Sequence, residues 1–156
     1  GDKAGITSTY APLLANPAQY GDLALTQAGV TASQAGNHDD AAKLFAAALD
    51  QNPYQRDALN NLANTNMQLK RWDAMLPPAR RLIDVDPGNP DAYLMTAIAY
   101  QGMAGAAKTP AAKKTLTDSL VKYNDLSTNL PYKVQYTEFT RGTSKTAVGY
   151  TVEHVK

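Results

Sequence analysis

The side chains that most often do chemistry in proteins are sparse in this chain of 156 residues. Cysteine is absent, which removes thiolate nucleophiles, disulfides and zinc-finger ligands together. The two histidines are His38 and His154, and neither has a second ligand at the spacing that a metal site needs. We therefore expect no metal centre.

Two groups of carboxylates stand close together in the sequence. Asp39 and Asp40 lie where a helix is expected to begin, and negative charge is favourable there because of the helix dipole. Asp84 and Asp86 lie where another helix is expected to end. Both groups are better explained as helix-end charges than as a general acid and base.

Serine and glycine patterns give no better candidate for catalysis. Ser119 and Ser127 have neither a nearby histidine nor the glycine context of a nucleophile elbow. Gly102 and Gly105 lack the strand-turn-helix setting of a phosphate-binding loop. We predict no catalytic, cofactor-binding or metal-binding residue, and we expect that the protein is not an enzyme and needs no cofactor.

One pair of amide side chains could do recognition chemistry instead. Asn60 and Asn64 are four residues apart, which places them on one face of a helix. Amides in that position could hydrogen-bond the backbone of a bound peptide. The alternative is that they are solvated side chains on a polar helix face.

The elements that must position these residues follow a fixed period. Small residues recur 34 positions apart, and so do large apolar residues and two prolines: Gly29, Ala63 and Ala97; Leu25, Leu59 and Tyr93; Pro53 and Pro87. A period of this length is typical of stacked helix-turn-helix units, which bury their apolar faces against each other.

The apolar spacing and the helix caps predict where each helix runs. The expected elements are a loose start over 1–15 with a helical turn around 10–14, then helices over 17–35, 39–51, 55–69, 72–84, 90–101 and 110–127. Pro77 and Pro78 predict a kink or a late start in the helix over 72–84. Residues 102–107 are expected to lengthen the third turn, and the last helix is expected to cap the array.

After residue 130 the pattern changes from helical to alternating. Residues 133–139 and 146–152 are rich in β-branched and aromatic side chains, which predicts a β-hairpin. Because an isolated hairpin is marginal in water, it must pack on the last helix, join strands of another chain, or begin a longer β-domain. An exposed strand edge also invites a partner strand, so the hairpin contributes predicted partner-binding residues: Tyr136, Phe139, Tyr150 and Val152.

Residues 22–55 and 56–89 resemble the tetratricopeptide repeat family. The residues that carry the resemblance are Leu25, Gly29, Ala32, Ala41, Phe45, Ala48 and Pro53, then Leu59, Leu62, Ala63, Trp72, Leu82 and Pro87, and finally Tyr93, Ala97 and Tyr100. The resemblance covers roughly residues 17–127 and implies a mainly α fold there, an α-solenoid of about three helix-turn-helix units. The β-hairpin lies outside the resemblance. Three parts are therefore expected: an N-terminal extension over 1–16, the repeat domain over 17–127 and the hairpin region over 128–156.

What the resemblance implies for function is a concave surface lined by the first helix of each unit. Partner contacts are then expected at Thr26, Val30, Gln34, Asn60, Asn64, Met67, Gln68, Leu94, Ile98 and Gln101, with Leu23, Ser33, Asp57 and Asp91 lining the same surface. Some family members hold a C-terminal carboxylate with Lys, Arg and Asn residues. Thr26 and Val30 replace the expected groups here, which argues against that mode.

Composition limits the class of partner. The chain has 15 basic and 14 acidic residues, a balance that argues against nucleic-acid binding. No apolar run is long enough to span a membrane. Low charge, abundant Ala, Thr, Asn and Gln, no cysteine and no initiator Met together favour an exported, periplasmic bacterial protein over a cytoplasmic one.

These observations favour a non-enzymatic protein–protein interaction module that docks onto a larger assembly. The partner would be a peptide segment, helix or strand of another protein. Two alternatives stay open: a purely structural subunit that uses its convex face and termini, and a regulatory fragment of a longer enzyme.

Overall fold

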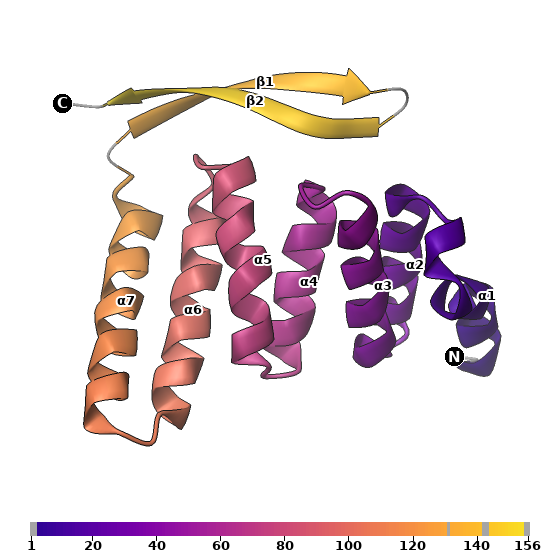
Figure 1. The fold of residues 1–156 in the computed structure, drawn as a ribbon, viewed down its shortest axis with the longest axis horizontal. Helices are drawn as coiled ribbons and strands as arrows, with labels where there is room; N and C mark the ends of the chain where they lie inside the picture. Colours follow the sequence, from indigo (N-terminus) through magenta and orange to yellow (C-terminus); the bar gives the residue numbers. More distant parts are fainter. Residues whose placement is uncertain (1–2, 131, 142–143, 155–156) are drawn as a thin grey trace.

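The computed structural model describes residues 3–130, 132–141 and 144–154, with the side chains of residues 5–130. Within these residues the fold is mainly helical, and its helices lie side by side in a row (Figure 1). The elements are α1 (Lys3–Ala15), the 3₁₀ helix η1 (Pro17–Gln19), α2 (Asp22–Gln34), α3 (His38–Gln51), α4 (Arg56–Gln68), α5 (Trp72–Val85), α6 (Pro90–Ala106) and α7 (Pro110–Thr128).

The helices form three successive pairs, α2 with α3, α4 with α5, and α6 with α7. The first helix of each pair begins 34 residues after the previous one, at Asp22, Arg56 and Pro90. Leu25, Leu59 and Tyr93 lie one turn into these helices, and all three side chains are buried. The predicted solenoid of about three helix-turn-helix units is therefore confirmed.

Two close contacts set the distance between neighbouring helices. Gly29 of α2 lies against the ring of Phe45 on α3, and a Cβ at this glycine would overlap the ring. Gly102 of α6 lies in the same way against the indole of Trp72 on α5. In both places an aromatic ring fills the space that a side chain would otherwise take.

The N-terminal segment departs from the sequence-based expectation. The sequence predicts a loose start, but α1 is a helix of 13 residues whose Tyr10 is only 1% exposed. Asn37 Nδ2, in the turn after α2, donates a hydrogen bond of 2.6 Å to Tyr10 Oη. The helix expected over 17–35 is also wrong at its start, because only the short η1 begins at Pro17 and α2 begins at Asp22, after Gly21.

The prolines of α5 do not delay the helix. It runs from Trp72 to Val85 through Pro77 and Pro78, so of the two expected alternatives, a kink or a late start, the late start does not occur. Pro78 has no N–H to offer the Ala74 carbonyl one turn earlier. Asn66 Nδ2 of α4 donates a hydrogen bond of 3.3 Å to that carbonyl and thus replaces the missing donor.

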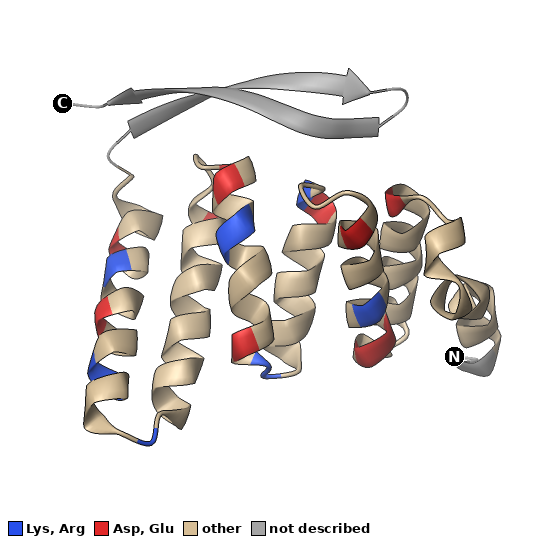
Figure 2. Cartoon of the chain, viewed as in Figure 1, with Lys and Arg blue, Asp and Glu red and all other residues tan. Residues whose placement is uncertain are grey.

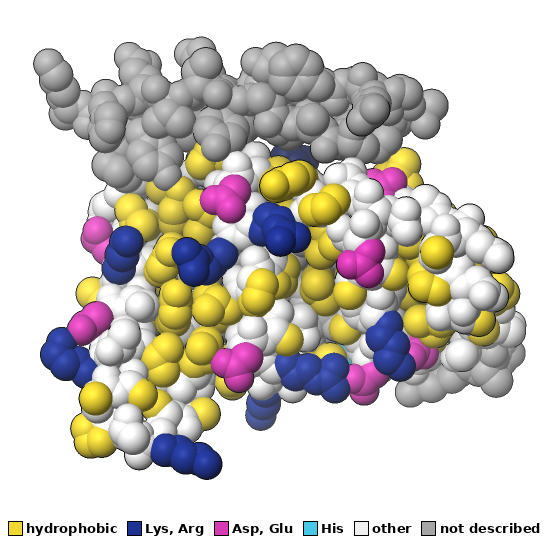
Figure 3. All heavy atoms as spheres, in the orientation of Figure 1, with side chains coloured by type: hydrophobic (Ala, Val, Ile, Leu, Met, Phe, Trp, Pro, Cys, Tyr) yellow, Lys and Arg dark blue, Asp and Glu magenta, His cyan; other side chains and the backbone are white. Residues whose placement is uncertain are grey.

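The third pair also differs from its predicted form. Residues 102–106 continue α6 instead of lengthening the turn, so α6 has 17 residues. None of the 19 residues of α7 is buried, and its Tyr123 stacks on Tyr100 with ring centroids 5.6 Å apart. Hydrophobic side chains gather over α6 beside α7 in the space-filling view (Figure 3).

After α7 the backbone changes from helix to strand. β1 (Tyr132–Arg141) and β2 (Ser144–His154) pair antiparallel in a two-stranded sheet. Tyr136 pairs with Tyr150 and Val134 with Val152, which places these four residues on one face of the sheet.

Candidate functional site

The candidate interaction surface lies on α2, α4 and α6. Among the described helices, α2 contacts α4 and α4 contacts α6, whereas α3 with α5 and α5 with α7 make at most marginal contact. The row of helices is therefore closer together on the side of α2, α4 and α6. We call the exposed and half-buried side chains of these three helices the inner face.

Most of the predicted contact residues have accessible side chains on the inner face. Leu94 on α6 is 42% exposed, and Leu23 on α2, which lines the same surface, is 48% exposed. The remaining accessible residues are Gln34, Gln68 and Gln101, which are exposed, and Val30, Asn60, Asn64, Met67 and Ile98, which are half-buried. The structure thus brings together amide and apolar side chains from three successive repeats.

Thr26 is the predicted contact residue that the structure turns inward. Its side chain is 8% exposed, and its Oγ1 donates a hydrogen bond of 2.8 Å to the Asp22 carbonyl oxygen in the preceding turn. Little of Thr26 is left for a partner to touch.

The amides of α4 fall into two classes. Asn66 is 5% exposed and donates to the carbonyls of Leu62 and Ala74, so its role is structural. Asn60 and Asn64 are half-buried, and within the described residues neither side chain makes a hydrogen bond. An amide in this state can offer both a donor and an acceptor to a peptide backbone.

The inner face carries almost no positive charge. Arg56 is the one Lys or Arg in α2, α4 and α6, and its Nη1 lies 3.7 Å from Asp86 Oδ2. Figure 2 shows the other described cations mainly on α3, α5 and α7 and in the turns. The first turns of α2, α4 and α6 contain Asp22, Asp57 and Asp91. With one paired arginine and three aspartates, the inner face has no set of cations that could hold an acidic peptide tail.

Asp39, Ser119 and Ser127, which were considered for catalysis, make structural contacts in the fold. Arg71 Nη2 lies 2.5 Å from Asp39 Oδ1. This ion pair links the turn between α4 and α5 to the start of α3, and so connects two successive helix pairs. Ser119 and Ser127 donate to backbone carbonyls of their own helix, α7. In the part of the chain with described side chains, no three His, Cys, Asp or Glu residues gather as metal ligands would.

The predicted contact residues of the hairpin lie on β1 and β2. Tyr136, Phe139, Tyr150 and Val152 have described backbone positions, and Tyr136 is paired with Tyr150. Their side chains lie outside the described residues, as does that of His154.

Sequence reasoning missed one exposed aromatic residue. Tyr54 precedes α4, and its side chain is 60% exposed. A tyrosine at such a position presents a large apolar ring and a hydroxyl to a partner. The signal in the sequence is the excess of tyrosine, nine against two phenylalanines and one tryptophan.

No described helix combines the length and the apolar character that crossing a membrane would require.

Comparison with known proteins agrees with the family resemblance over part of the chain. Residues 32–74, from the end of α2 to the start of α5, match the family model described as Tetratricopeptide repeat. A solved structure with a similar fold is that of a thermophilic TPR protein of Thermus thermophilus, at 24% identity and a TM-score of 0.55. The match covers 69% of this chain and 57% of that protein. No curated protein matches the chain.

Proposed function

We propose that this tetratricopeptide repeat protein is a non-enzymatic module that docks onto a larger protein assembly through its inner face. Its family and fold are those of protein–protein interaction modules. The observation that carries the proposal is the surface of amide and apolar side chains on α2, α4 and α6. Single exposed apolar residues are common on proteins, but here Leu23 and Leu94 share a face with uncommitted amides.

The charges of the inner face favour a particular class of partner segment. Arg56 is paired, and the other described charges of these helices are acidic. We therefore propose a segment with uncharged apolar contact residues, whose backbone groups meet Asn60 and Asn64. Such contacts gain their free energy from burial of apolar area and from hydrogen bonds.

We further propose that the C-terminal hairpin adds a second contact. Its apolar residues, including Tyr136 and Tyr150, pair across the two strands, and an exposed strand edge can accept a further strand. The hairpin would then fix the orientation of the partner segment that the inner face holds. A role as subunit of an exported, periplasmic complex is a proposal that rests on composition alone.

The proposal is tested by removing the central contacts of the inner face. We expect Asn60→Ala, Asn64→Ala and Met67→Ala together to remove the partners that the unmodified protein retains in native affinity purification with mass spectrometry. The matched control replaces three cations outside the inner face, Arg81→Ala, Lys114→Ala and Lys122→Ala. Circular dichroism of both variants checks that the helices are intact.

A second candidate function is a fixed structural subunit that uses the outer helices α3, α5 and α7. The concentration of Lys and Arg on these helices favours it, because charges at a rim steer association (Figure 2). Under this alternative, the control variant loses the partners and the inner-face variant keeps them. That result would contradict the proposed function.

A further inference from the structure

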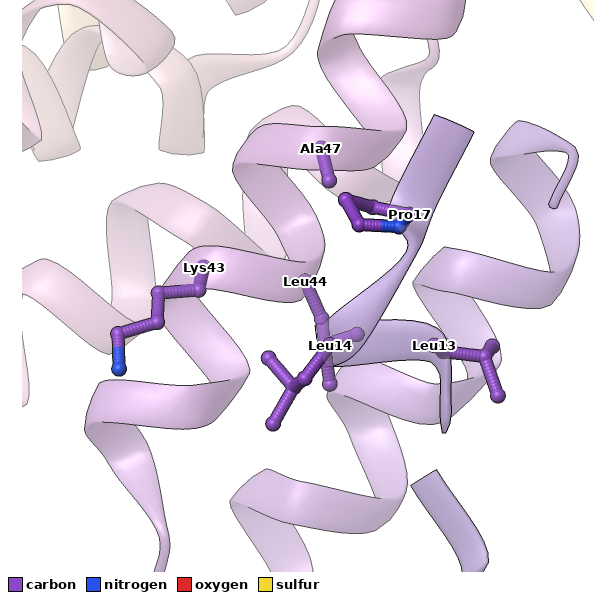
Figure 4. A pocket seen from close by; sticks show the side chains of 6 residues that line it. All are labelled: Leu13, Leu14, Pro17, Lys43, Leu44 and Ala47. Atoms are coloured by element: carbon purple, nitrogen blue, oxygen red, sulfur yellow. The ribbon is translucent and has the colours of Figure 1, made fainter. Parts of the chain in front are cut away.

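A small cavity lies away from the inner face, where the N-terminal helix meets the first repeat. Its volume is about 80 Å³, and it lies between the end of α1, the start of η1 and the outer helix α3 (Figure 4). The residues that line it are Leu13, Leu14, Pro17, Lys43, Leu44 and Ala47.

The lining is almost entirely aliphatic carbon. Leu44 is fully buried, whereas Leu13 and Leu14 are half-buried. The cavity is partly open to solvent, so water can enter it, but its lining offers that water few hydrogen-bond partners. The side chains of the lining offer only the ammonium group of Lys43, so an aliphatic group suits the cavity better than water.

The one charged group of the lining lies at its edge. Figure 4 shows the ammonium nitrogen of Lys43 directed away from the leucines, so the methylene stem forms the wall. The Lys43 side chain is 70% exposed, and its Nζ lies 3.6 Å from Asp40 Oδ1. An exposed ion pair at this distance is weak, so the ammonium can accept a carboxylate that arrives with a ligand.

The cavity is particular to this junction and is not a general feature of the repeat. The equivalent positions one repeat later, 34 residues on, replace all three leucines and the lysine: Ala47, Ala48, Gln51, Pro77, Pro78 and Arg81. Of the two junctions compared, only the one where α1 and η1 meet α3 therefore has both the aliphatic lining and the cation at its edge.

We propose that this cavity binds one aliphatic side chain of a partner protein, with an adjacent acidic side chain pairing with Lys43. The volume and the apolar lining select a short aliphatic group, and the charge of Lys43 selects the carboxylate beside it. An acidic side chain fits better than a chain terminus, since a terminal carboxylate is usually held by several donors and the lining has one. The site is formed by α1, η1 and α3, so it is independent of the inner face.

The experiment uses the full chain with ¹³C-labelled leucine and alanine methyl groups, observed by NMR during titration with short peptides. The probe is acetyl-Gly-Leu-Asp-Gly-amide. We expect saturable shifts of the methyl groups of Leu13, Leu14, Leu44 and Ala47. Replacement of leucine by alanine in the peptide should weaken binding about fivefold or more. Replacement of aspartate by asparagine should weaken it about two- to fivefold.

Two protein variants separate the roles of the cavity and of the charge. Lys43→Gln should abolish the preference for the aspartate peptide over the asparagine peptide while leaving the leucine preference. Ala47→Leu should fill the cavity and abolish the shifts, and unchanged methyl signals of Leu59 and Leu82 would show that the repeats stay folded.

Three results would overturn the proposal. The first is that the cavity methyl groups show no saturable shift with the probe, and the second is equal binding of the leucine and alanine peptides. The third is that acetyl-Gly-Gly-Leu with a free carboxylate binds more tightly than the probe, which would make a chain terminus the occupant.

Discussion

Gly36 and Lys70 occupy the same place in successive turns, 34 residues apart, and both have left-handed backbone conformations. Their φ angles are +79° and +55°. In each turn the following residue donates from its N–H to a carbonyl near the helix end, Asn37 to Ala32 and Arg71 to Asn66. This is the glycine-favoured way to end a helix, and lysine adopts it against its preference.

We predict that Lys70→Gly stabilises the protein by about 0.5–1 kcal/mol, because glycine adopts this conformation without the cost that a side chain brings. The matched change Gly36→Ala should destabilise it by about 1 kcal/mol. Urea unfolding with an unchanged slope measures both. Equal effects of the same sign would contradict this explanation of the two turns.

A second prediction at this scale concerns the prolines of α5. Asn66→Ala removes the donor that serves the Ala74 carbonyl and should cost about 1–3 kcal/mol. In the Pro78→Ala background an N–H returns at position 78, so the same asparagine change should cost about 0.5–1.5 kcal/mol less. Chemical denaturation of the unmodified protein, the two single variants and the double variant gives the coupling free energy between Asn66 and Pro78. An identical cost of Asn66→Ala in both backgrounds would show that Asn66 does not compensate for Pro78.

The role of Asn66 could not be predicted from the sequence, because it depends on Pro78, twelve residues away on a different helix. Asn60 and Asn64, by contrast, could be assigned to one helix face from their spacing and to the concave surface from the family resemblance, and both are half-buried on α4. Thr26 shows the limit of such spacing. A residue at the edge of a helix face can turn inward when its hydroxyl finds the carbonyl of the preceding turn.

At the scale of helices, the distance between α2 and α3 depends on the missing side chain of Gly29. We predict that Gly29→Ala destabilises the protein by about 1–3 kcal/mol, because the new methyl group would overlap the ring of Phe45. The control is Gly105→Ala near the end of α6, where a Cβ meets nothing within 4 Å. This change should be neutral or stabilise by up to about 1 kcal/mol, since alanine favours a helix.

Thermal and urea unfolding of the two glycine variants make the comparison. Combination of Gly29→Ala with Phe45→Leu, which removes the ring, should recover part of the loss. If the double variant recovers no stability, the contact between Gly29 and Phe45 is not the cause of the loss.

Element boundaries were predictable where a cap or a proline marks them. Asn89 and Thr109 accept hydrogen bonds from the first turns of α6 and α7, each followed by proline, as their sequence pattern predicts. The helix α1 was not predictable because it contains Gly5, Thr7 and Pro12, which are poor helix formers. Its formation depends on burial of Tyr10 against the first repeat, and packing of that kind is not visible in local sequence.

At the scale of the molecule, the 34-residue period was enough to predict an array of paired helices with Leu25, Leu59 and Tyr93 at equivalent buried positions. The period does not report what differs between units. The cavity beside α1 and the lack of burial in α7 both arise where the array departs from its repeat. A partner is therefore expected to recognise the departures as well as the repeated surface.

The charge distribution of the whole molecule yields a last prediction, on the salt dependence of partner binding. The inner face has one arginine, already paired with Asp86, whereas the outer helices carry most of the other cations (Figure 2). Binding through the inner face should then rest on apolar burial and hydrogen bonds, which salt screens little. We expect the dissociation constant of the purified partner complex to change less than about threefold between 0.05 and 0.5 M NaCl, measured by calorimetry. A loss of affinity of about tenfold or more would place the contact on the cations of α3, α5 and α7, and the inner face would lose its assigned role.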